Sequence, residues 1–139
     1  MAQSDSSEIL KRFLEYLTKR DINGITSLFA ENVDWYIPGD IKRAPWLGRR
    51  STRSEVKSFF ELLWRNTDPV DAAIDHIFFD NERAVVAGSF TTKMLMTDTI
   101  VNSLFFIHLK IENGRISWYR LLEDSFAVSV SLNEAEAVV

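Results

Sequence analysis

The chain has 139 residues, of which 46% are hydrophobic and 26% charged, and its formal net charge is −4. This length and apolar content suit a single domain with its own core. The sequence contains no cysteine, which excludes a disulfide framework, a thiol nucleophile and a thiolate metal site. Acidic and basic residues are interspersed, whereas nucleic-acid binders usually have a basic face, so we expect no nucleic-acid partner.

The N-terminal segment 1–11 is polar, and no apolar run reaches the length of about 18 residues that would suggest a membrane span. We therefore expect neither a signal peptide nor a membrane partner. The expected location is the cytoplasm. One domain is predicted over residues 1–139, with frayed ends at 1–5 and 133–139.

The first part of the chain is predicted to be helical. Asp5 followed by Glu8 has the spacing of a capping box, in which two side chains satisfy free backbone N–H groups at a helix N-terminus. Apolar residues then recur at helical spacing through about Arg20, namely Ile9, Leu10, Phe13, Leu14 and Leu17. Asp21 is expected to cap a second, short helix.

A strand, a loop and a third helix are predicted next. The aromatic and β-branched segment 33–37 predicts a strand, and Pro38-Gly39 ends it. The loop 38–51 is expected to form the rim of a cavity, with Trp46 as a movable wall. Its basic residues indicate a solvated loop more than an anion-binding mouth; they are Lys42, Arg43, Arg49, Arg50 and, just beyond it, Arg53. A second capping box, Thr52 with Glu55, begins a helix that must end before Pro69.

From residue 71 the apolar period changes to two, which predicts antiparallel strands. Turns at 80–81, 97–98 and 113–114 separate them, and Asn113-Gly114 is a strong hairpin signal. Apolar and polar residues also alternate over 126–132. This segment is either an extension that covers a partner or a frayed end. Helices followed by strands predict an α+β fold, a cone-shaped curved antiparallel sheet wrapped around three N-terminal helices and enclosing one cavity.

The outer face of this sheet keeps apolar positions such as Leu104 and Phe106, which predicts a homodimer through that face. The only histidines, His76 and His108, lie on different predicted strands. We therefore expect structural roles for both, no metal site and no cofactor.

Three motifs resemble the nuclear transport factor 2-like superfamily, in particular its SnoaL-like, polyketide cyclase-like and ketosteroid-isomerase-like branch. They are the segment 21–30, Leu47-Gly48-Arg49 before the third helix, and the segment 106–116 with a terminal Glu123-Asp124. The resemblance covers residues 6–126 and implies the cone with a ligand cavity. Because the superfamily holds isomerases, cyclases, epoxide hydrolases and non-enzymatic adaptors, the fold does not fix the function.

The catalytic groups of two relatives are not retained. Ketosteroid isomerase uses a Tyr, a base Asp and a protonated Asp, and the resemblance implies that these positions fall at Phe13, at Ile37 or a neighbour, and at Ile107. The Arg–Asp pair of limonene epoxide hydrolase falls near Gly88 and Phe90, and its last-strand Asp falls at Leu121.

Glu123 follows Leu121 by two residues and Tyr119 by four, so all three share one strand face. Among apolar neighbours such as Trp35, Ile107 and Leu109, the pKa of Glu123 would rise toward the range that suits a general acid or base, and Tyr119 could orient a substrate oxygen. The alternative places Glu123 in water at the sheet edge or against a loop arginine. The expected pocket holds a small apolar molecule and is lined by Phe13, Leu17, Trp35, Ile37, Trp46, Phe60, Trp64, Phe90, Ile107, Leu109 and Leu121.

Three functions remain open on this basis. The first is an enzyme doing acid–base chemistry of the isomerase, cyclase or hydrolase type. The second is a binding protein without turnover. The third is a dimeric interaction module whose interior is filled by aromatic side chains.

Overall fold

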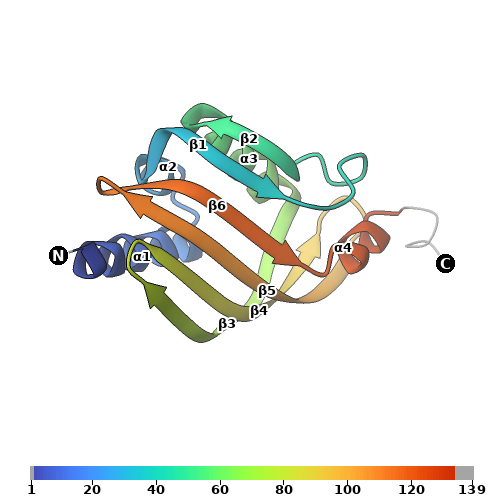
Figure 1. Cartoon of the computed structure of the whole chain (residues 1–139). Coiled ribbons are helices and arrows are strands. Elements are labelled where there is room, and N and C mark those ends of the chain that lie inside the picture. The colour runs from blue at the N-terminus through green and yellow to red at the C-terminus, as the bar shows by residue number, and fades with distance from the viewer. Residues whose placement is uncertain (1, 134–139) are drawn as a thin grey trace.

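The chain folds as a curved sheet with helices on its concave side, as the computed structural model in Figure 1 shows. The structure describes residues 2–133 and the side chains of residues 6–133. Its elements in chain order are α1 (Ala2–Lys19), α2 (Ile22–Ser27), β1 (Phe29–Ile37), β2 (Gly48–Thr52), α3 (Arg53–Asn66), β3 (Thr67–Asp80), β4 (Arg83–Met94), β5 (Thr99–Glu112), β6 (Arg115–Glu123) and α4 (Ser125–Ser131). No helix in this described part is long and apolar enough to cross a membrane.

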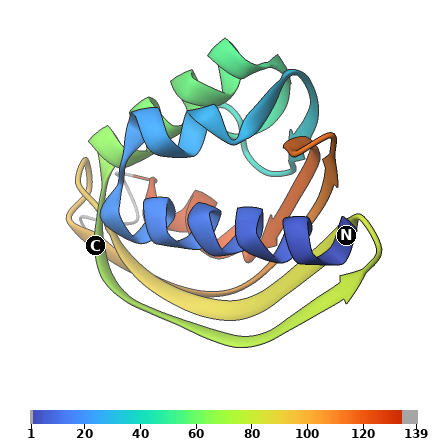
Figure 2. The same cartoon turned by 90° about the vertical axis from the view of Figure 1, so that its left-hand side faces the viewer.

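Six strands form one sheet in the order β2-β1-β6-β5-β4-β3. Figure 2 shows the sheet curving around α1 as an open cone, which confirms the predicted α+β fold class. All neighbours are antiparallel except β1 and β6, which run parallel. The prediction of a purely antiparallel sheet is wrong at this pairing. β1 and β6 are far apart in the chain, so no short hairpin forces them to run in opposite directions.

The two faces of the sheet differ in burial. In β5 every second residue from Val101 to Ile111 is buried, whereas the residues between them are exposed or half-buried. Directly paired residues share a face, and the β4 partners Ala84 and Val86 are buried as well. We call the buried side, which meets the helices, the inner face, and the opposite side the outer face.

Helix α1 begins earlier than predicted, at Ala2. Asp5 therefore lies within the helix, and the predicted capping box at Asp5 is wrong, whereas the predicted frayed end at residues 1–5 stays a prediction. The sequence before Asp5 contains no helix breaker, so the helix is free to extend over it. Glu8 instead forms an ion pair with Arg12, one turn further on, with 3.3 Å between Oε1 and Nε.

The two other predicted helix starts are confirmed. The Asp21 carboxylate accepts a hydrogen bond of 2.9 Å from the Gly24 amide at the start of α2. Thr52 and Glu55 make both hydrogen bonds of a capping box at the start of α3. These short-range contacts depend only on local spacing, which is why the sequence reveals them.

Part of the predicted loop 38–51 is a strand. Gly48–Thr52 pairs with β1 as β2, and β1 itself begins at Phe29, earlier than Val33. The segment is polar and rich in arginine, so it has no strand pattern of its own. Its backbone takes up the strand conformation by pairing with the edge of β1.

Residues 125–131 form helix α4, so the segment 126–132 is not a frayed end, and its role as a partner-covering extension stays a prediction. Asp124 caps this helix by accepting a 2.9 Å hydrogen bond from the Ala127 amide. The buried residues Val128, Ser131 and Leu132 have the spacing of one helix face. The rest of the predicted frayed end, residues 134–139, lies outside the described residues.

The sequence predicts that the side chains of β3 alternate between the two faces without interruption, but the strand contains a register shift. The register to β4 shifts between Ile74 and His76, so Ile74 lies on the inner face and His76 on the outer one. Gly88 lies opposite Ile74, and a Cβ at Gly88 would be 2.2 Å from the Ala73 carbonyl oxygen. Only glycine allows the irregular strand to approach this closely.

The outer face carries large exposed apolar side chains, namely Phe78, Ile100, Leu104, Phe106 and Leu122. Because such a set suggests an interface, we expect a homodimer through this face, detectable by light scattering at micromolar concentration. Phe106→Asp is expected to weaken the dimer at least about tenfold. Met96→Asp, an equally exposed apolar residue in the β4–β5 turn, is the matched control. A wild-type chain that is monomeric under these conditions would contradict the prediction.

Candidate functional site

The structure divides the residues of the predicted pocket into two groups. Most are fully enclosed in the core, at no more than 3% exposure; these are Phe13, Trp35, Ile37, Trp46, Phe60, Ile107, Leu109 and Tyr119. The others are only partly buried against that core, and they are Leu17, Trp64, Phe90 and Leu121. Trp46 thus belongs to the core group, and its role as a movable rim wall stays a prediction.

Aromatic rings fill the space around Tyr119. Tyr119 and its β1 partner Trp35 stack with ring centroids 4.1 Å apart and an interplanar angle of 13°. Phe13 and Phe29 contact the Tyr119 ring at 5.9 and 6.0 Å. The Trp35 Nε1–H is buried and has no hydrogen-bond partner among the described residues. This part of the predicted pocket is packed core.

Glu123 lies at the end of β6, where it pairs with Phe105 of β5. Phe105 is buried, so this pairing places the Glu123 side chain on the inner face, on the same side as Tyr119. Its predicted neighbours Ile107 and Leu109 pair instead with Leu121 and Tyr119. Glu123 is half-buried. Its carboxylate makes no hydrogen bond or ion pair within the described part of the chain, and it does not pair with a loop arginine.

Burial raises the pKa of Glu123 to about 7, and the negative charge of Asp124 adds to the effect. Burial, and secondarily the charge of Glu123, also raises the pKa of Tyr119 well above its ordinary value. Near pH 7 Glu123 can therefore either accept or donate a proton, whereas Tyr119 remains a hydrogen-bond donor.

The chain turns sharply just after Glu123, and the turn is fixed by polar contacts. The Asp124 amide donates a 2.8 Å hydrogen bond to the Ser103 hydroxyl, which donates in turn to the Leu104 carbonyl at 2.7 Å. Asp124 also caps α4, as described above. These contacts give Asp124 a structural role and hold the backbone next to Glu123 in place.

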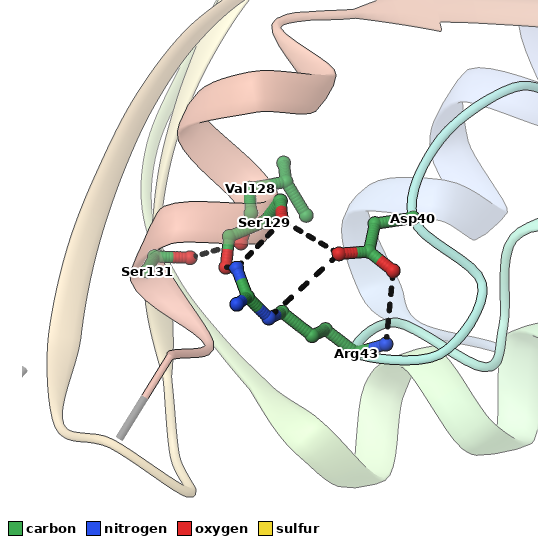
Figure 3. A network of polar contacts seen from close by, with 5 residues as sticks. All are labelled: Asp40, Arg43, Val128, Ser129 and Ser131. Carbon is green, nitrogen blue, oxygen red and sulfur yellow. Dashed lines mark hydrogen bonds and ion pairs between the residues drawn. The ribbon is translucent and has the colours of Figure 1, made fainter. Parts of the chain in front are cut away.

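Helix α4 is joined to the loop between β1 and β2, as Figure 3 shows. Ser129 donates a 2.7 Å hydrogen bond to the Asp40 carboxylate and accepts one of 3.1 Å from Arg43. The Ser129 bond is the main reason why the pKa of Asp40 is lowered. The loop and α4 thus cover the same end of the sheet, the end at which Glu123 lies (Figure 1).

The basic residues of this loop mostly satisfy protein acceptors. Arg50 donates to the Glu55 carbonyl and, at 3.4 Å, to the Trp46 carbonyl. Arg53 donates to the Phe29 carbonyl at 2.9 Å, and Arg49 lies 4.2 Å from the centre of the Tyr36 ring. These contacts favour structural roles over an anion-binding mouth.

A groove of about 610 Å³ lies at the end of the sheet where β6 ends. It is bordered by outer-face side chains such as Leu104, Phe106 and Leu122, and also by Phe90, Ser103 and Glu123, whose strand pairings place them on the inner face. The groove thus brings together Phe90 and Glu123 of the predicted site. The histidines lie on the outer face, where His108 contacts Trp118 at 4.7 Å and His76 contacts Phe78 at 5.8 Å. No cluster of three or more metal-ligand side chains occurs among the described residues.

Sequence reasoning missed Ser103 and the contacts of Asp40, Arg43 and Ser129. Isolated serines carry no periodic signal. Asp40 in the loop and Ser129 in α4, which are joined by a hydrogen bond, lie 89 positions apart in the sequence. Only Asp124, which precedes a polar–apolar segment as an N-cap does, offered a local signal for the helix that brings Ser129 to the loop.

Known structures share this architecture. An NTF2-like protein from Burkholderia xenovorans LB400 superposes with a TM-score of 0.83 at 18% identity, covering 94% of this chain and 97% of that chain. TerC co-crystallized with polyporic acid gives a TM-score of 0.76 at 18% identity, with 92% and 98% covered. An LEH-like epoxide hydrolase from M. tuberculosis gives 0.72 at 12% identity, with 93% and 90% covered. These matches establish a nuclear transport factor 2-like fold.

The sequence itself matches the family model of the SnoaL-like domain over residues 10–119, so the chain belongs to the SnoaL-like family. No curated protein matches it.

Proposed function

We propose that this SnoaL-like protein binds a small, largely apolar molecule between its helices and the inner face of its sheet, and that Glu123 exchanges a proton with it. The observation that carries the proposal is the half-buried Glu123 carboxylate, which has no partner in the described chain and a pKa raised to about 7. A carboxylate with that pKa is suited to general acid–base catalysis near neutral pH.

The binding site is proposed around side chains that are only partly buried against the core, namely Leu17 of α1, Trp64 of α3, Phe90 of β4 and Leu121 of β6. These four groups supply apolar contact area, and Glu123 lies one same-face step beyond Leu121. Tyr119, protonated throughout the neutral range, is the second polar group and would orient a substrate oxygen. Similar structures include an epoxide hydrolase and a protein co-crystallized with polyporic acid, which supports a small-molecule ligand.

Polyporic acid is a practical first probe, with binding followed by quenching of tryptophan fluorescence. Turnover is sought in parallel with small hydrophobic ketones and epoxides. Glu123→Gln is expected to keep probe affinity within about threefold and to lower turnover by about 10²- to 10⁴-fold, the usual contribution of a general acid or base. Glu61→Gln, an exposed carboxylate on α3, is the control. Unaltered turnover in Glu123→Gln would remove Glu123 from the mechanism.

A binding protein without turnover is the second candidate. It is favoured by the tight packing of Tyr119, which is only 2% exposed beneath Trp35 and has little freedom to meet a substrate. In that case the wild-type chain and Glu123→Gln would bind the probe equally, and neither would transform any member of the panel.

A further inference from the structure

β3 is the long edge strand of the sheet, and its outward side is unpaired by any other strand of the described chain. Every residue from Asp68 to Phe78 is exposed. Several of these residues are large and apolar, with Val70 at 59%, Ile74 at 47%, Ile77 at 41% and Phe78 at 58% exposure. A strand with free backbone N–H and C=O groups and exposed apolar side chains is a template for pairing with another chain.

A groove of about 460 Å³ runs beside this edge, between β3 and α1. Its apolar wall is formed by Leu10 and Leu14 of α1 and by Ile77 and Phe79 of β3. Ile77 and Phe79 pair with the buried residues Val86 and Ala84, so both point to the inner face, toward α1. A strand added to the edge would place every second side chain in this groove.

The charge of the edge determines which strand can pair there. β3 contains four aspartates and neither lysine nor arginine. Asp71, Asp75 and Asp80 are exposed and form no ion pair within the described chain. Asp71 and Asp80 pair with Thr91 and Arg83, positions of the outer face, so their carboxylates lie on the side away from the groove.

A second copy of this chain is a poor occupant of the edge. Pairing β3 with another β3 would bring the aspartates of both strands together, and like charges in adjacent strands are destabilising. The shift in register between Ile74 and His76 and the proline at 69 restrict regular pairing with any added strand to the part of β3 beyond the shift, residues 76–80. A strand with basic side chains on its outer face meets no such repulsion.

We propose that the β3 edge and the α1–β3 groove bind an extended protein segment by strand addition. The segment alternates apolar side chains, which enter the groove against Ile77 and Phe79, with basic side chains, which are attracted by Asp80 on the outer face and by Asp75, exposed at the register shift. The α1 wall of the groove carries Lys11, Glu15 and Lys19, so basic side chains of the partner are confined to the outer face. This interaction is independent of Glu123 and of any small-molecule ligand.

The test uses the full chain and a labelled heptapeptide of alternating lysine and valine, acetylated and amidated at its ends. Hydrogen–deuterium exchange followed by mass spectrometry is expected to show slower exchange in residues 74–80 when the peptide is present. Fluorescence anisotropy is expected to show saturable binding, about tenfold weaker for the double variant Asp75→Asn, Asp80→Asn, which removes the two exposed carboxylates that flank Ile77 and Phe79. The double variant Glu31→Gln, Glu61→Gln removes two exposed carboxylates elsewhere and should bind as the wild type does.

Three results would overturn the proposal. The first is equal binding by the same peptide with glutamate in place of lysine. The second is peptide binding that leaves exchange in residues 74–80 unchanged. The third is protection of these residues that rises with protein concentration in the absence of peptide, which would assign the edge to a second copy.

Discussion

Glu123→Gln is expected to stabilise the chain at neutral and alkaline pH but not at pH 4. Burial raises the pKa of Glu123 from 4.5 to about 7 in the folded state, so folding favours the protonated carboxyl. As the pH rises from about 4.5 to 7, the unfolded chain releases this proton while the folded chain retains it, and the wild type loses stability. Above pH 7 the loss is complete. Glutamine is a neutral analogue of the protonated carboxyl group, so the Glu123→Gln variant does not lose this stability as the pH rises.

The expected gain is on the order of 2 kcal/mol above pH 7, a figure reduced from the full pKa difference because the side chain is half-buried. It is measured as the difference in free energy of unfolding between variant and wild type, from urea titrations at pH 4, 6 and 8. Glu61→Gln, on the exposed side of α3, serves as the control and should follow the wild type at every pH. A difference that does not depend on pH would mean that Glu123 is solvated in the folded chain.

Phe29→Ala is expected to lower the free energy of unfolding by about 3–5 kcal/mol, the usual cost of removing a buried phenylalanine ring. Phe29 is fully buried and contacts four aromatic residues, Phe13, Trp35, Phe60 and Tyr119, at centroid distances between 5.7 and 6.4 Å. The cavity left by the ring would adjoin the stacked pair of Trp35 and Tyr119. These rings are too rigid to fill the space by changing rotamer.

Phe126→Ala is the matched control, because Phe126 is 77% exposed at the start of α4. Its effect is expected to stay within about 0.5 kcal/mol, as is usual for surface positions. Thermal and urea denaturation of both variants measure the contrast. A loss below about 1 kcal/mol for Phe29→Ala would mean that the aromatic cluster is loosely packed.

The family relationship narrows the function only in part. The SnoaL-like family shares the cone, but similar structures include an epoxide hydrolase and TerC, so the fold does not fix the reaction. Our expectation that two known catalytic sets fall at Phe13, Ile37 and Ile107 or near Gly88, and so are not retained, stays a prediction. At Gly88 the structure adds a physical reason, since the Ala73 carbonyl leaves no room for a side chain. Glu123 is a half-buried inner-face carboxylate that belongs to neither catalytic set, and its titration is therefore the most informative measurement.

The sequence by itself determined the features that depend on local spacing and periodicity. The helix caps at Asp21 and Thr52 are satisfied by residues three positions away, and the two-residue period places Tyr119, Leu121 and Glu123 on one face. The raised pKa of Glu123 was only one of the alternatives that this placement allowed, because the two-residue period does not show whether the end of the strand is buried.

Only the tertiary structure decided the features that depend on distant segments. β2 has no strand pattern and exists because β1 offers it an edge, and α4 is held in place through Ser129 by Asp40 and Arg43. Whether Trp35 and Tyr119 line a pocket or fill a core was likewise decided by the rings of other elements that pack around them. In each case the stabilising contact joins residues far apart in the chain, so no pattern within either segment could reveal it.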